Sequence, residues 1–334
     1  MMSDTQEKDP QRAPGLRNNP WVRQRNVNIR WFLSLCVCAC ILLIVARQMR
    51  WDVGPLPALL SVLPWAGVMC AGIALLAWRL RMSSVAVVAL IVTLAVAYLW
   101  APAFTVNEQA TPIVGAPTLR LMSFNCMGNP ATIGALARAA QADSVDVLAV
   151  VEAVPFIHRD LANSALSTLF KYRYLTADDQ VGIWSRRPLS DVSSLPMGFV
   201  GKAARVRIGG STLTLLAVHP RSPRYTQAAQ WRHDQSQLMG IVREQPAGPL
   251  VVAGDFNMTR DNDAFRDYLN NGFVDAADIN GKGWKGTWSY GPDNWALVAI
   301  DHFLGRGVHM SHFDTVVIDG SDHRAIVSDI QVGG

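Results

Sequence analysis

Three long apolar runs in the first third of the chain constrain its fold more than any other feature. They cover residues 31–46, 56–78 and 83–104, and short segments containing arginines separate them. The second and third are long enough for a helix to cross the hydrocarbon core of a bilayer, which takes roughly 20 residues. The first is shorter, but Arg30 and Arg47 at its ends can reach the membrane interface. We therefore expect three transmembrane helices.

The arginines around these runs predict an orientation. Residues 1–30 are polar and Arg-rich, which indicates a disordered basic tail. Arg79 and Arg81 separate the second and third runs, whereas the first basic residue after the third run is Arg120. Because basic segments stay in the cytoplasm, we expect a multi-pass cell-membrane protein whose C-terminal part is extracytoplasmic. A secretory signal peptide is the alternative for the first run, but no small-x-small cleavage pattern follows it.

Composition separates the remainder of the chain from this anchor. Half of the residues are hydrophobic and only 17% are charged, a low share for a soluble protein. The net charge of +4 invites a nucleic-acid interpretation, yet residues 1–117 contain 10 Lys and Arg against 5 Asp and Glu, and residues 118–334 contain 20 against 21. The basic excess therefore reflects membrane topology. Residues 105–117, rich in Pro and Gly, predict a linker, and 118–334 a single domain.

Polar side chains stand where the predicted strands of this domain end. Residues 250–253 read as a short buried strand, and the Gly254-Asp255-Phe256-Asn257 segment that follows puts Asp255 and Asn257 on one side. In isolation this segment is as easily an Asx turn, and the other strand ends have similar local explanations as caps or turns. Several such ends gathered at one sheet edge favour a catalytic site. The other residues are Asn125, Glu152, His219, Asp301, Asp322 and His323.

The order of these residues resembles the endonuclease/exonuclease/phosphatase (deoxyribonuclease I-like) superfamily. Its most diagnostic parts here are Gly254-Asp-Phe-Asn257 and Ser321-Asp-His323, and the likeness extends over 118–334. It implies an α/β (α+β) fold, a four-layered αββα sandwich of two mostly antiparallel sheets, here preceded by three transmembrane helices. The anchor resembles that of membrane-bound bacterial members described as teicoplanin-resistance proteins.

The resemblance implies a metal site. Glu152 would ligate a divalent ion, and Asn125 and Asp322 would complete or border the site. Oxygen ligands without a thiolate favour Mg²⁺, with Mn²⁺ as the alternative. The segment Val-Val-Glu152-Ala departs from the more usual Gln-Glu pair, so an amide beside the ligand is missing.

The resemblance also implies catalytic roles. His323, polarised by Asp301, would contact the scissile phosphate or move a proton. Asp255 would orient the attacking water, and Asn257 and His219 would donate to the non-bridging oxygens as charge develops on them. Whether Asp255 or His323 is the base stays open.

Two further segments are candidates for substrate contact. Arg221 and Arg224 could clamp a second phosphate or an acidic head group, although a solvated loop explains them equally well. Trp288 lies in a glycine-rich loop with other aromatic residues, which either form an apolar rim for lipid or a base, or pack the loop down. These other residues are Trp284, Tyr290 and Trp295.

Together these features predict a membrane-anchored, metal-dependent phosphoesterase acting on a phosphodiester, phosphomonoester or pyrophosphate. A lipid-linked envelope substrate is favoured, because tethering raises the encounter rate with lipid-borne phosphate and a neutral domain lacks the basic surface of a duplex binder. The expected partners are the lipid bilayer and the phosphorylated substrate, with nucleic acid less favoured and no protein partner identifiable. The alternatives are an extracytoplasmic nuclease and a catalytically silent membrane scaffold of the same fold.

Overall fold

The structure of the chain is a computed structural model that describes residues 20–176, 179–196, 200–224, 226–289 and 295–333. Residues 1–19 of the predicted tail, and Tyr290 of the aromatic loop, lie outside the described residues. The chain divides into two compact units. One contains Trp65–Val96 together with the residues up to Leu42, and the other contains Leu43–Pro64 together with the residues from Ala97 onward.

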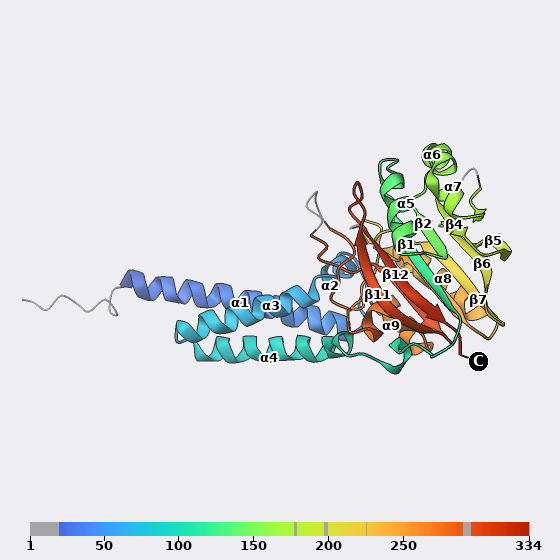
Figure 1. Cartoon of the computed structure of the whole chain (residues 1–334). Helices are drawn as coiled ribbons and strands as arrows, with labels where there is room; N and C mark the ends of the chain where they lie inside the picture. Colours follow the sequence, from blue (N-terminus) through green and yellow to red (C-terminus); the bar gives the residue numbers. More distant parts are fainter. Residues whose placement is uncertain (1–19, 177–178, 197–199, 225, 290–294, 334) are drawn as a thin grey trace, which may run out of the picture. The chain divides into compact units, whose positions relative to one another are not determined.

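Three apolar helices precede the sheets (Figure 1). They are α1 (Pro20–Gln48), α3 (Leu63–Arg79) and α4 (Ser83–Trp100). Two helical stretches, Gln24–Gln48 and Ser83–Phe104, are long and apolar enough to cross a membrane, whereas α3 has 17 residues and is shorter. The expectation of three transmembrane helices is therefore corrected to two candidates among the described residues. Such helices fit a membrane anchor or, for α1, a signal sequence.

The boundaries of these helices also differ from the predicted ones. The second apolar run is two helices, because α2 (Leu56–Leu60) ends before α3 begins and Pro64 occupies the first turn of α3, where its missing N–H is not needed. Helix α1 begins at Pro20, so residues 20–30 are helical and do not belong to a disordered tail. No Gly or Pro interrupts α1 after Pro20, which is why the helix runs on through the polar residues.

Two six-stranded sheets form the C-terminal part (Figure 1). The first has the order β11-β12-β1-β2-β4-β3 and the second β5-β6-β7-β8-β10-β9. Each sheet contains one parallel pair, β1 with β2 and β7 with β8, and every other pair is antiparallel. The strands of the first sheet are β1 (Thr118–Asn125), β2 (Val147–Val151), β3 (Tyr172–Tyr174), β4 (Val181–Ser185), β11 (His309–Val317) and β12 (Arg324–Gln331). Those of the second are β5 (Leu189–Ser194), β6 (Val200–Ile208), β7 (Ser211–His219), β8 (Leu250–Asp255), β9 (Val274–Asp275) and β10 (Asp301–Arg306).

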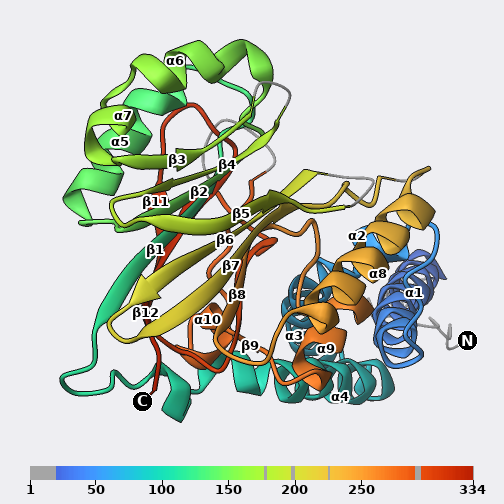
Figure 2. The ribbon, with the colours of Figure 1, turned by 90° about the vertical axis from the view of Figure 1, so that its right-hand side faces the viewer.

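The sheets pack face to face between two outer layers of helices, as Figure 2 shows. The central core is built from alternate residues of both sheets, such as Leu121, Ala149, Leu215, Val251 and Phe303. The opposite faces of the central strands pack against the helices, and a strand buried on both faces, such as β2, is therefore apolar throughout. Helices α5 (Thr132–Ala142), α6 (His158–Asn163) and α7 (Ala165–Leu169) cover the first sheet, and α8 (Ala228–Glu244) and α9 (Asp263–Asn270) cover the second. The predicted four-layered αββα sandwich is thus confirmed.

The segment predicted as a linker is held against the sandwich. Asn107 N donates to Ile279 O of the short helix α10 (Ala276–Ile279) over 2.8 Å, and Val106 forms an isolated β-bridge with Asn280. Further along, Ile113 N donates to the Gln331 side chain of β12 over 2.7 Å. Residues 105–117 therefore belong structurally to the C-terminal unit.

Candidate active site

The topology gathers the polar strand ends at one edge of the two sheets. The parallel pairs β1–β2 and β7–β8 end with or just before Asn125, Glu152, His219 and Asp255. Strand β10 runs antiparallel to β8 and starts at this edge, so Asp301 lies directly opposite Asp255. Strand β12 also starts here, directly after His323.

Gly254 allows the second sheet to deliver Asp255. Its φ of +148° is unfavourable for side-chain-bearing residues, and a Cβ atom there would lie 2.0 Å from Val218 O of the neighbouring strand. Two non-glycine residues of the site, Glu152 (φ +54°) and Asn257 (φ +50°), also have left-handed backbones. Such conformations persist only where their surroundings enforce them, and they concentrate at functional sites.

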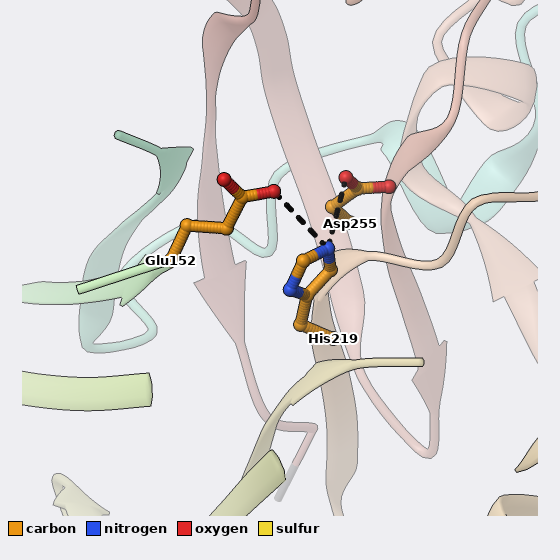
Figure 3. A group of neighbouring side chains, drawn as sticks. All are labelled: Glu152, His219 and Asp255. Carbon is orange, nitrogen blue, oxygen red and sulfur yellow. Dashed lines mark ion pairs between the residues drawn. The ribbon is translucent and has the colours of Figure 1, made fainter. Parts of the chain in front are cut away.

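Glu152, His219 and Asp255 form the first cluster of the site (Figure 3). His219 Nε2 lies 3.6 Å from Glu152 Oε1 and 3.5 Å from Asp255 Oδ2. All three ligand atoms lie within 4.8 Å of one another. The Glu152 side chain is 34% exposed whereas Asp255 is almost fully buried, so the cluster opens to solvent on the Glu152 side.

This cluster suits a hard divalent cation. Two carboxylates and an imidazole offer oxygen and nitrogen donors, and a buried carboxylate needs a compensating positive charge. Of the predicted donors Asn125, Glu152 and Asp322, this cluster contains Glu152. Asn125 directs its amide nitrogen to Glu152 Oε1 and Asp255 Oδ2, each at 3.0 Å, while its oxygen accepts from Met127 N. Asn125 could therefore ligate a cation only after its amide turns over and gives up that bond.

Asp322 belongs to neither of the ligand clusters found among the described residues. Its Oδ2 accepts a 3.0 Å hydrogen bond from Trp288 Nε1, and its Oδ1 lies 3.9 Å from His323 Nε2. Trp288 also forms β-bridges with Val298 and His323. The structure thus places Trp288 beside the histidine, where it orients the Asp322 carboxylate.

Asp301 and His323 form the second cluster with Asp255. His323 Nδ1 lies 2.9 Å from Asp301 Oδ2, and His323 Nε2 lies 3.6 Å from Asp255 Oδ2. All three side chains are buried. The imidazole therefore bridges the two carboxylates, with one ring nitrogen fixed by Asp301 and the other facing Asp255.

Burial and charge act in opposite directions on these groups. Burial lowers the pKa of His323, but the charges of Asp301 and Asp255 raise it by more than burial lowers it. The pKa of His323 therefore lies well above the usual histidine value. Burial raises the pKa of Asp255, yet the charges of His323 and His219 bring it below the usual range. At Asp301 the effect of burial is larger than the opposing effect of the His323 charge, so the pKa of Asp301 is raised. The pair next to the open cluster is therefore a carboxylate, Asp255, and a protonated imidazole, His323.

His219 and Asn257 meet on the other side of Asp255. The Asn257 amide nitrogen lies 3.4 Å from His219 Nε2 and donates to Pro220 O over 3.1 Å. Asn257 N donates to Asp255 Oδ1 over 2.8 Å. Burial lowers the pKa of His219, but the hydrogen bond and charge of Asp255 raise it above its usual value.

The two arginines proposed as a phosphate clamp are not equivalent. Arg221 pairs with the buried Asp234 of α8 through its Nε at 3.0 Å, and its backbone N–H donates to the same carboxylate. Arg221 thus fastens the loop after His219 to the helix layer. Arg224 is exposed.

Three supporting residues were not singled out from the sequence. Ser321 Oγ donates to Asn125 O and accepts from His323 N, which ties β1 to the histidine turn. Thr287 Oγ1 accepts from Ile300 N and Asp301 N, and the Gln235 side chain donates to Phe256 O. Only Ser321 carried a sequence signal, through its place beside Asp322-His323. The other two come from segments without a strand-end pattern.

Comparison with known proteins agrees with this architecture. The sequence pattern of the Endonuclease/Exonuclease/phosphatase family matches residues 122–328, more than half of the chain. No curated protein matches the chain at a significant level.

Solved structures of similar fold include D. rerio TDP2 in complex with a single-strand DNA product, with 18% identity and a TM-score of 0.54. SmcL (15% identity, TM-score 0.51) and an endonuclease/exonuclease/phosphatase family protein from Leptotrichia buccalis (15%, 0.50) are also similar. Each alignment covers 64% of this chain and 99% of the other.

Proposed function

Because the chain belongs to the endonuclease/exonuclease/phosphatase family, whose members are mostly hydrolases of phosphoesters, we propose that it is a divalent-metal-dependent phosphoesterase. The observation that carries the proposal is the Asp301–His323–Asp255 arrangement beside the Glu152 cluster. It brings a potential proton donor, a carboxylate and a cation site within one small volume, as hydrolysis at phosphorus requires.

Glu152 and Asp255 would hold the metal ion, and His219 lies within reach as a nitrogen donor once its Nε2 is deprotonated. When bound, the ion would supply Lewis-acid polarisation of a phosphoryl oxygen. Asn125, between the two carboxylates, keeps them oriented through its hydrogen bonds. Mg²⁺ is favoured over Mn²⁺ as the physiological ion by the two carboxylates.

The remaining residues of the site orient the attacking water, transfer protons and bind the phosphate. Asp255, a carboxylate at neutral pH, accepts a hydrogen bond from the attacking water, orients it and takes its proton as the new P–O bond forms. His323, protonated and held by Asp301, contributes positive charge at the phosphate and gives a proton to the leaving oxygen. Asn257 donates to a non-bridging oxygen, with His219 beside it.

A lipid-linked phosphoester is the proposed substrate class. Trp295 and Leu297 are 77% and 51% exposed, and they lie between Trp284 and the Val298 position that pairs with Trp288 of the site. Trp284 in turn contacts the rings of Trp100 and Phe104 at the end of the last apolar helix. The exposed apolar side chains of Trp295 and Leu297, together with the ring contacts of Trp284 at the helix end, favour a substrate that arrives from a lipid surface.

The proposed location is the cell membrane, with the catalytic part extracytoplasmic. Arg79 and Arg81, between α3 and α4, support this orientation through the positive-inside rule. With the basic residues before α1 on the same side, it requires the 17-residue α3 to cross the membrane as well. A reporter that is active only outside the cytoplasm, fused after the last residue, tests it. Activity of a cytoplasmic reporter at the same position would reverse the orientation.

The activity is tested by hydrolysis of bis-p-nitrophenyl and p-nitrophenyl phosphate with Mg²⁺, Mn²⁺ or EDTA. We expect metal-dependent turnover that Asp255→Asn and His323→Ala abolish. The substrate class is tested on envelope lipid phosphates in detergent and on plain DNA. Salt-sensitive cleavage of DNA would indicate a nuclease instead, and no turnover of any substrate would indicate a silent scaffold.

A further inference from the structure

The polypeptide directly after the Gly254–Asn257 segment is buried although it is polar. Thr259, Asp261 and Asn262 are each less than 5% exposed, and Asp261 is fully buried. A buried carboxylate and a buried amide are stable only when other groups satisfy them. The groups that do so come from residues far earlier in the chain.

Asp261 is satisfied by the end of α1 and by Trp100. Arg47 Nε lies 2.7 Å from Asp261 Oδ1, and both side chains are buried. The indole nitrogen of Trp100 donates to Asp261 Oδ2 over 3.1 Å. Arg47 makes a second contact through its carbonyl, which accepts a hydrogen bond from Arg266 of α9. Arg47, Trp100, Asp261 and Arg266 all belong to one compact unit.

The hydrogen bonds of Asn262 and Asp263 are made with residues 52 and 57, in the connection between α1 and α2 and at the start of α2. The Asn262 side chain donates to Pro57 O over 3.1 Å, and Asp263 N donates to Asp52 Oδ2 over 2.8 Å. Asn262 occupies the N-cap position of α9 but makes no side-chain cap hydrogen bond. A helix is normally capped by the side chain of its own N-cap residue. Here Asp52, from an earlier part of the same chain, supplies the carboxylate at the N-terminus of α9 instead.

The same stretch is fastened on its active-site side. His302 Nε2 lies 3.0 Å from Met258 O, and His302 Nδ1 lies 2.9 Å from Asp275 Oδ2. Asn257 lies in the sequence between Asp255 and Met258. Its left-handed backbone conformation is stable only when contacts with surrounding residues hold it. Only five residues separate Asp255 from Asp261, so the contacts of Met258 and Asp261 both act on a short segment that begins at Asp255.

We propose that Arg47 and Asp52 are positioning residues, which hold the 255–262 segment in its hydrolytic conformation without touching the substrate. The segment Leu43–Pro64 then forms part of the catalytic unit. It fixes the geometry of the 255–262 segment and also attaches the sandwich to the helices. This inference rests on the proposed hydrolytic activity, because the quantity that it predicts is a change in turnover number.

The test compares the full-length protein in detergent with Arg47→Gln, measured by kcat and KM on bis-p-nitrophenyl phosphate below the unfolding temperature of each variant. We expect kcat to fall at least about ten-fold while KM stays within about two-fold, since the lost interaction acts on the reacting geometry. Arg47→Lys, which keeps the charge, should recover part of the loss. Arg50→Gln is the matched control, because Arg50 pairs with Asp263 and Asp267 of the same helix α9 but is half exposed.

A double variant gives a second readout. If Arg47 acts through Asp261, Arg47→Gln combined with Asp261→Asn should lose no more activity than the worse single variant. If Arg47→Gln does not fold, Asp261→Asn alone replaces it with the same expectation for kcat. A kcat equal to that of the wild type, or equal losses in the Arg47 and Arg50 variants, overturns the inference. An inactive wild type overturns the proposed function, and is thereby distinguished from failure of the positioning role.

Discussion

Asp255 and Asp301 are direct register partners across the antiparallel strands β8 and β10, and a single imidazole, that of His323, contacts both carboxylates. Two buried carboxylates side by side repel each other unless a positive charge lies between them. His323 supplies that charge, which explains why its pKa is raised while that of Asp255 is lowered.

Asp301→Asn tests this arrangement. The amide cannot stabilise the imidazolium, so we expect kcat to fall by about 100-fold, within the range for a lost acid–base partner. Asp329→Asn is the control, because Asp329 pairs with His312 outside the site at 3.1 Å. Steady-state kinetics on bis-p-nitrophenyl phosphate measures the effect. Equal activity of Asp301→Asn and the wild type would exclude the proposed proton role of His323.

Glu152→Gln tests the cation site. Removal of one carboxylate should weaken Mn²⁺ or Mg²⁺ binding by about 10- to 100-fold, so that activity requires correspondingly higher metal concentrations. Calorimetric titration with Mn²⁺ and the metal dependence of turnover both report this. Asp160→Asn, an exposed acid on α6, should titrate like the wild type. Unchanged Mn²⁺ affinity in Glu152→Gln would place the ion elsewhere.

His302→Gln should change how stability depends on pH. Burial lowers the pKa of His302, but the charge and hydrogen bond of Asp275 raise it above the ordinary 6.5. The folded protein therefore binds this proton more tightly than the unfolded chain, and the resulting stability is fully present below 6.5 and lost as pH rises through the raised value.

The unfolding temperature of the wild type should therefore exceed that of His302→Gln most at about pH 5–6, with the gap narrowing toward about pH 9. His309→Gln on β11, outside this cluster, should follow the wild type throughout. A gap that widens with pH would show that His302 is neutral in the folded protein.

Trp295→Ala with Leu297→Ala should separate lipid from soluble substrates. We expect about ten-fold lower activity on a lipid phosphate in mixed micelles and unchanged activity on bis-p-nitrophenyl phosphate, because the apolar contact acts on docking. Phe156→Ala removes an apolar side chain of similar exposure, 71%, from the short 3-10 helix Pro155–Ile157 and should affect neither activity. Parallel losses on both substrates would mean that the loop supports the fold.

The sequence predicted the sandwich well where patterns were local. Strand β8 contains the short apolar run at residues 250–253, so the apolar pattern found it. The edge strand β5 has no such apolar pattern, since Ser and Asp dominate it and most of its residues are exposed. The apolar runs were found but divided wrongly, because hydropathy does not register that Pro64 favours the first turn of a new helix.

In the candidate site, too, local sequence patterns predicted some features and not others. Strand ends predicted the convergence of Glu152, Asp255, Asp301 and His323, because the polar residue after a buried strand is visible in the sequence. The orientation of the Asn125 amide and the Trp288–Asp322 bond depend on side-chain rotation. The pairing of Arg47 with Asp261 joins residues more than 200 positions apart, and no sequence periodicity could reveal it.

The hydrogen bonds of Asp261 and Asp263 have a consequence for the fate of the protein in the cell. Val114, in the segment that connects the last apolar helix to β1, is 99% exposed and so accessible to a protease. Cleavage there would leave Arg47, Asp52 and Trp100 on one fragment and Asp261 on the other, linked only by noncovalent contacts. Separation of the two fragments would leave the buried Asp261 carboxylate without Arg47 and Trp100, so the released sandwich should be less stable than the intact chain and, if Arg47 has the proposed positioning role, less active.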